Sequence, residues 1–195
     1  MNTLRLPQAT LARLRARHAQ PQRRYHTQAH VDALLRWLAL HAALAARRDL
    51  VEAAIWFHDA VYDPTRADNE AQSAALARTE LAALAWPDDA IARVAALVLA
   101  TQHHDAARDD RDAWLFLDLD LSILGQGATT YRAYADQIRA EYAFVPEPRY
   151  REGRIGVLGR FLERDAIYRT PALHAAWETT ARANLADEIR RLRRA

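Results

Sequence analysis

The chain of 195 residues contains no cysteine. Without cysteine there is neither a disulfide framework nor a thiolate zinc site, so any metal site must be built from histidine and carboxylate side chains. Lysine is absent as well, and every basic side chain is an arginine. The formal net charge is only +2. That balance gives no electrostatic case for a nucleic-acid platform, and nucleic acid is not expected as a partner.

Long hydrophobic runs are also missing. Hydrophobic residues make up 51% and charged residues 27% of the chain, as in a globular protein. No apolar stretch approaches the roughly 20 residues that a membrane span needs. The N-terminal stretch MNTLRLPQATLARLRARHAQ interrupts its leucines with arginines and lacks the apolar core of a secretory signal. The sequence therefore predicts a cytoplasmic protein with no membrane partner.

Glycine is scarce, with five residues, and the alternating pattern typical of strands is nearly absent. Alanine, leucine, arginine and glutamate instead recur at helical spacing, which predicts an all-α protein. The length suits one compact core. We therefore expect a single-domain helical bundle over residues 1–195, with about seven or eight helices.

Capping residues and prolines indicate where these helices begin and end. Asp49 is typical of a helix N-cap, with Glu52 three residues later, and this helix is expected to stop before Pro64. Thr170 followed by Pro171 predicts the start of the last helix. Four more helices are expected between these two, at residues 68–86, 88–104, 112–124 and 129–145.

Most of the eight histidines occupy candidate site positions: His26, His30, His41, His58, His103 and His104. His26 and His30 are four residues apart, so a helix would place them on one face. His58 is followed directly by Asp59 inside the apolar stretch AAIWFHDAVYD, and His104 lies in ATQHHD. A buried aspartate is costly unless a cation or hydrogen bonds compensate it. A metal ion would do so, and so would pairing with the abundant arginines.

A second apolar stretch, WLFLDLDLSILG, also contains acidic side chains. Asp118 and Asp120 are two residues apart, so on a helix they point about 200° away from each other and cannot both face one ion. Asp120 has only apolar neighbours three and four positions away, whereas Asp118 has Ser122 four residues later. Asp120 is therefore expected to face the cation. The alternative is that these acids cap helices or pair with arginines.

The order of these residues resembles the HD superfamily of metal-dependent phosphohydrolases, and most closely its small bacterial, mostly uncharacterised branch. Six stretches carry the resemblance: RRYHTQAHV, WFHDAVYD, DNEAQSA, ATQHHD, DLDLSILG and YRTPALHAAWETTARANL. The resemblance covers residues 7–192, nearly the whole chain. It implies a helical bundle of the HD type that holds a metal ion.

The resemblance also implies which residues bind that ion. The implied metal ligands are His26, His58, Asp59 and Asp120. His30 and His104 would either bind a second ion or support the ligands of the first. Imidazole and carboxylate ligands suit several divalent ions, and the sequence does not choose among Mn²⁺, Fe²⁺, Co²⁺, Ni²⁺, Zn²⁺ and Mg²⁺.

The activity implied by the resemblance is hydrolysis of a small phosphate ester, such as a nucleotide or related metabolite, by a metal-bound hydroxide. Arg24 and Arg154 are candidate phosphate contacts, because a planar guanidinium binds two phosphate oxygens at once. Asp59, Asp63 and Glu70 are the catalytic candidates. For Asp63 and Glu70, a role in a turn or at a helix N-terminus is an equal alternative.

Two other functions are left open. One is a di-metal oxygenase on the same scaffold, which would need bound iron and His30 or His104 as an extra ligand. The other is a non-catalytic helical module that binds a nucleotide or a protein. Assembly into a homo-oligomer is also left open. Three glycines beside Arg154 are expected to allow either close backbone approach or tight helix packing: Gly153, Gly156 and Gly159.

Overall fold

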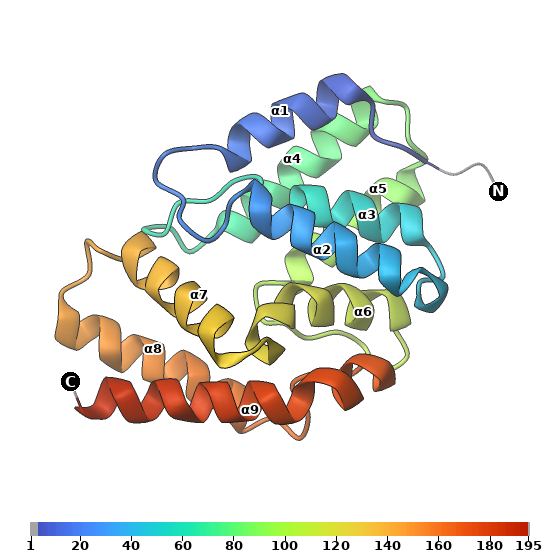
Figure 1. The fold of residues 1–195 in the computed structure, drawn as a ribbon. Coiled ribbons are helices and arrows are strands. Elements are labelled where there is room, and N and C mark those ends of the chain that lie inside the picture. The colour runs from blue at the N-terminus through green and yellow to red at the C-terminus, as the bar shows by residue number, and fades with distance from the viewer. Residues whose placement is uncertain (1–3, 195) are drawn as a thin grey trace. The chain divides into compact units, whose positions relative to one another are not determined.

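The computed structural model describes residues 4–194. Over this range the chain folds into nine α-helices and two short 3₁₀ helices, with no strand (Figure 1). The predicted all-α class is confirmed, with one or two more helices than expected. None of the described helices is both long enough and apolar enough to cross a membrane.

The chain divides into two compact units, Met1–Leu119 and Asp120–Ala195. The boundary falls at the last residue of helix α6 (Arg111–Asp120). The division does not test the prediction of a single domain, which stays a prediction.

The first unit is organised around helix α3 (Arg48–Phe57), which contacts helices α1, α2, α4 and α5. Every residue from Leu50 to His58 is buried except Glu52. A helix that is apolar on nearly all sides belongs in a core, and here it carries His58 into that core. The other elements of this unit are α1 (Gln8–His18), α2 (Gln28–Leu40), η1 (Ala42–Leu44), α4 (Asn69–Ala83), α5 (Asp88–Ala100) and α6.

Helix α3 begins one residue before the predicted cap. Its N-cap is Arg47, and Asp49 lies in its first turn. The Asp49 carboxylate accepts hydrogen bonds from the Arg47 guanidinium and from the backbone N–H of Leu4. The N-cap prediction for Asp49 is therefore wrong, because this carboxylate is already occupied by groups outside the helix.

The end of helix α3 also differs from the prediction. The helix stops at Phe57, with His58 as its C-cap, and does not continue to Pro64. The backbone carbonyl of Asp59, which a longer helix would use internally, accepts a hydrogen bond from Arg23 instead. The backbone N–H of Asp63 donates to the side chain of Asn69. These competing hydrogen bonds end the helix beside His58.

Helix α6 is fixed at its start by two carboxylates. Asp112 accepts hydrogen bonds from the backbone N–H groups of Ala46 and Arg47, at 2.7 and 2.9 Å. Asp110 pairs with Arg93 and accepts the N–H of Ala113. The helix runs to Asp120, and the remainder of the predicted segment continues as the 3₁₀ helix η2 (Leu121–Gly125).

The second unit contains η2, α7 (Ala128–Glu141), α8 (Glu147–Leu162) and α9 (Pro171–Arg194). Helix α9 starts at Pro171 as predicted and packs along α8 (Figure 1). It also contacts η2. Its Asn184 amide donates to the carbonyls of Leu124 and Gln126, both at 2.8 Å. A side chain at Gly125 would clash with Trp177, so glycine is what allows this close approach.

Candidate metal centre

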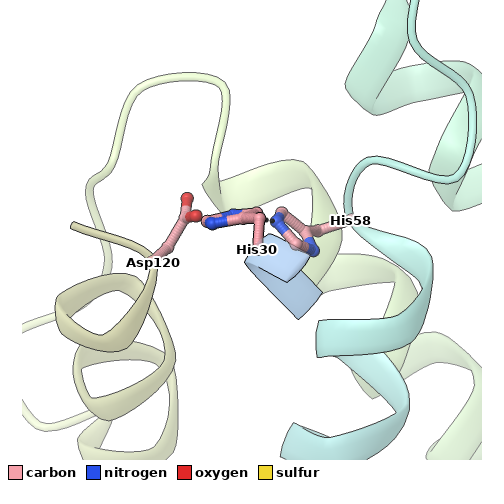
Figure 2. Close-up of side chains that lie close together, drawn as sticks. All are labelled: His30, His58 and Asp120. Atoms are coloured by element: carbon pink, nitrogen blue, oxygen red, sulfur yellow. Dashed lines mark hydrogen bonds between the residues drawn. The ribbon is translucent and has the colours of Figure 1, made fainter. Parts of the chain in front are cut away.

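Three helix ends bring ligand atoms together in Figure 2. His30 lies in the first turn of α2, His58 is the C-cap of α3, and Asp120 is the last residue of α6. One ligand atom of each residue lies within 4.8 Å of the others. Asp120 is placed by α6, whose residues from Arg111 to Leu119 belong to the first unit.

The two histidine rings face each other through the same type of atom. Nε2 of His30 lies 3.2 Å from Nε2 of His58, and the residues are only 6% and 1% exposed. Nδ1 of His58 lies 2.8 Å from the backbone carbonyl of Ile55. A carbonyl only accepts, so Nδ1 carries the hydrogen, and when the ring is neutral Nε2 presents a lone pair.

The Asp59 carboxylate also lies near Nε2 of His58. Its Oδ2 lies 3.1 Å from Nε2 of His58 and 4.0 Å from Nε2 of His30. When His58 is neutral, a hydrogen on His30 Nε2 satisfies the contact between the two rings, and the Asp59 oxygen then lies beside the lone pair of His58. Two acceptors at this distance repel each other unless a proton or a cation lies between them.

We call these four residues the His–Asp cluster: His30, His58, Asp59 and Asp120. Buried imidazole nitrogens and carboxylate oxygens are the ligands that first-row divalent metals prefer. The bond from His58 Nδ1 to a backbone carbonyl is also typical of metal sites, where it fixes the ring and its tautomer. The group of His30, His58 and Asp120 therefore has the composition and the spacing to bind a metal ion.

The structure brings His30, rather than His26, to His58. His26 lies in the loop before α2, whose N-cap is Thr27, so the two histidines do not share a helix face. The His26 ring packs on Tyr62 with the centroids 4.3 Å apart, and it lies 6.1 Å from the ring of His30. The structure thus favours His30 for the ligand position that the resemblance gives to His26.

The remaining two metal candidates lie outside the group of close ligand atoms. His104 ends the turn after α5 and has a positive φ of 47°, a conformation that histidine adopts more readily than most residues. Asp118 is buried on α6 but is not part of the group, whereas Asp120 is. The helical period that separates these two aspartates explains the difference.

The two candidate proton-transfer residues lie in the segment between α3 and α4. The Asp63 carboxylate accepts hydrogen bonds from the backbone and hydroxyl of Thr65, at 2.9 and 2.7 Å, and these bonds lower the pKa of Asp63. A carboxylate held ionised in this way is a poor proton donor. Glu70 lies in the first turn of α4, where a negative charge complements the helix dipole. The geometry favours the turn and helix-terminus roles.

The two candidate phosphate contacts have different surroundings. Arg24 is exposed, and its guanidinium donates to the carbonyl of Pro21 at 2.7 Å. Arg154 is buried and pairs with Glu188 at 2.8 and 3.3 Å, so its guanidinium is committed to the second unit. The expected tight packing at three neighbouring glycines is wrong, because a Cβ would meet no atom within 4 Å at Gly153, Gly156 or Gly159.

Two buried residues of the first unit escaped the sequence analysis. Arg23 is 3% exposed and donates to the backbone carbonyls of His26, in the loop before α2, and of Asp59, directly after His58. His18 is fully buried, with Nε2 at 3.2 Å from the carbonyl of Trp56. Burial lowers the pKa of His18 to about 4. No spacing pattern marks either residue, because their partners are distant in the chain.

Comparison with family models, with curated proteins and with solved structures finds no match to this chain. The relation to the HD superfamily therefore remains a resemblance carried by the stretches quoted above. The fold of the described residues and the site together define a class: an all-α protein with a group of two buried histidines and a half-buried aspartate that could hold a metal ion.

Proposed function

We propose that the protein is a metal-dependent phosphohydrolase acting on a small phosphate ester, with the His–Asp cluster as its metal site. The observation that carries the proposal is that imidazole and carboxylate side chains lie close together. Imidazole nitrogens of His30 and His58 and a carboxylate oxygen of Asp120 lie within 4.8 Å of one another in a largely buried place, with the Asp59 carboxylate 3.1 Å from His58. Such an arrangement is stabilised when a cation occupies the point of convergence.

A divalent ion fits the charge of the cluster. Two neutral imidazoles and two carboxylates carry a formal charge of −2, which a divalent cation balances. Four protein ligands leave coordination positions for water and substrate in five- or six-coordinate metals. The Asp59 side chain is 18% exposed, whereas the His58 side chain is 1% exposed. Substrate access is therefore expected on the Asp59 side.

The chemistry follows from this arrangement. A bound divalent ion lowers the pKa of water toward neutrality and polarises a phosphoryl oxygen. The protein's own residues orient the site: the carbonyl of Ile55 fixes the ring of His58, and α6 presents Asp120. Arg24 stays a candidate for binding phosphate, because it is exposed in the loop before α2. Arg154 is not proposed for this role.

Metal analysis of protein purified without chelator tests the proposal, followed by a hydrolysis screen with nucleotides and sugar phosphates. We expect one divalent ion per chain and phosphate release that chelation abolishes and metal restores. Protein that contains no metal, and takes up neither Mn²⁺, Co²⁺ nor Zn²⁺ in titration, would contradict the metal site. Bound iron together with oxygen consumption and no phosphate release would favour the oxygenase instead.

A further inference from the structure

Arg23 is almost completely buried, with 3% of its surface exposed. Its guanidinium donates to the backbone carbonyl of His26 at 2.9 Å and to that of Asp59 at 2.7 Å. A third, longer bond reaches the carbonyl of Ala60 at 3.4 Å, and Gln20 accepts from the remaining side at 3.3 Å. One side chain thus joins two segments that are more than 30 residues apart in the chain.

The two joined segments lead directly to the metal ligands. Residues 20–27 form the loop that enters α2, which carries His30 in its first turn. Residues 59 and 60 directly follow His58 at the end of α3. The carbonyls of Asp59 and Ala60 lie beyond the end of the helix, and Arg23 donates hydrogen bonds to them.

An aromatic contact supports the same join. The Cζ atom of Arg23 lies 5.3 Å from the ring centroid of Tyr62, and the ring of Tyr62 lies on His26 with the centroids 4.3 Å apart. Tyr62 belongs to the segment after α3, and His26 to the loop before α2. The guanidinium, the tyrosine ring and the imidazole therefore form one continuous contact between the segments.

We infer that Arg23 is a positioning residue for the proposed metal site. It sets the distance between His30 and the pair His58–Asp59 by holding the backbone on both sides, without contributing a ligand. The inference rests on the proposed function for the role of the ion, but the join itself consists only of the Arg23 guanidinium and backbone carbonyls.

The shape of the guanidinium explains why arginine is required. Its planar fork offers five N–H donors in fixed directions and can reach carbonyls of both segments at once. A lysine ammonium is a single point charge on a flexible stem and cannot span the same acceptors. Arg23→Lys therefore keeps the charge while removing the join.

A matched control exists in the second unit. Arg182 also donates to backbone carbonyls at a helix end, those of Leu162 at 2.9 Å and Arg164 at 2.7 Å. It pairs in addition with Glu178 at 2.7 Å. Arg182→Lys removes a similar set of bonds and is expected to lower the melting temperature without touching the His–Asp cluster.

The experiment measures Co²⁺ binding by calorimetry and by the visible absorption of bound cobalt, in wild type, Arg23→Lys and Arg182→Lys. We expect Arg23→Lys to weaken Co²⁺ binding by about 10- to 100-fold, the usual loss when a residue supporting the ligands is replaced, and to change the spectrum. Arg182→Lys should bind as wild type does. Equal affinity and equal spectra in wild type and Arg23→Lys would overturn the positioning role and leave the metal site intact.

Hydrogen exchange of the metal-free protein separates the two proposals. Arg23→Lys should exchange faster than wild type in residues 20–30 and 58–62, with residues 162–166 unchanged. Unchanged exchange in the first two segments would overturn the inference, whatever the metal does. If wild type binds no Co²⁺, the metal site fails, and faster exchange in Arg23→Lys would still establish that Arg23 holds these segments together.

Discussion

Polar groups in the two units have different kinds of neighbours. In the second unit, Glu188 is 3% exposed and meets two donors, the guanidinium of Arg154 at 2.8 and 3.3 Å and the hydroxyl of Tyr131 at 2.5 Å. In the first unit, Nε2 of His58 lies beside Nε2 of His30 and beside the carboxylate of Asp59. A buried carboxylate that meets hydrogen-bond donors stabilises the fold, whereas imidazole nitrogens and carboxylates gathered at one place form a group that could hold a metal ion.

Glu178 extends the pattern of the second unit. It accepts hydrogen bonds from the backbone N–H groups of Ile167 and Tyr168 and pairs with Arg182. Burial alone would raise the pKa of Glu178, but these donors outweigh burial and lower it. The carboxylate is therefore ionised and satisfied without any external group.

Breaking the buried pair in the second unit should have the largest effect. Glu188→Ala leaves the Arg154 guanidinium buried without its carboxylate and should lower the free energy of unfolding by about 3–5 kcal/mol. Urea unfolding measures this loss. Metal affinity of the remaining folded protein should equal that of wild type, and a weakened affinity would show that the contrast between the units is incorrect.

Acid should weaken the first unit through His18. The folded pKa of about 4 lies below the ordinary value of 6.5, so the unfolded chain takes up the proton first as the pH falls. The stability that neutral His18 allows is complete above pH 6.5 and is lost between pH 6.5 and 4, by up to about 3 kcal/mol.

Urea unfolding of metal-free protein at pH 7 and pH 5 measures this effect, with His18→Gln as the comparison. The variant has no titrating side chain at this position. Its free energy of unfolding should therefore fall less between pH 7 and pH 5 than that of wild type. Equal losses would remove His18 as the cause.

Asp120→Asn should separate stability from metal binding. It keeps the shape of the side chain but removes one negative charge, so we expect metal affinity to fall by about 100-fold or more. The metal-free protein should be no less stable, because one of the converging acceptor charges is gone. Asp118→Asn is the control on the same helix and should leave metal content nearly unchanged. Calorimetric titration measures the metal affinity, and thermal melts measure the stability. Loss of metal binding in Asp118→Asn but not in Asp120→Asn would make Asp118 the ligand.

The smallest effect is expected on helix α8. Gly156 is exposed in the helix interior, and a Cβ there meets no atom within 4 Å. Alanine restricts the unfolded chain more than glycine does, so Gly156→Ala should raise the free energy of unfolding by about 0.5–1 kcal/mol. The melting temperature would report it. A loss of stability would indicate a contact at this face.

Much of the fold could be predicted because its signals are local. The apolar run of α3 and the Thr170–Pro171 pair marked a core helix and a helix start, and both are present. Helix α8 was missed, since three glycines spaced by three residues obscure an otherwise helical segment. The end of α3 was misplaced because Arg23, far away in the chain, takes the carbonyl that would have continued the helix.

The candidate site shows the same limit. Helical periodicity separates Asp120 from Asp118 without any tertiary information. The choice between His26 and His30 depends on where α2 begins, and a helix boundary cannot be read to within two residues from sequence. Thr27 is the N-cap, which leaves His26 outside the helix and turns its ring onto Tyr62.

The side chain and the backbone of Asp59 make separate contacts. Its carboxylate faces His58, while its backbone carbonyl accepts a hydrogen bond from Arg23. A replacement of the side chain leaves the backbone bond in place, because every residue type carries the same carbonyl. The side chain at position 59 can therefore change without removing the bond that joins the loop before α2 to the segment after α3.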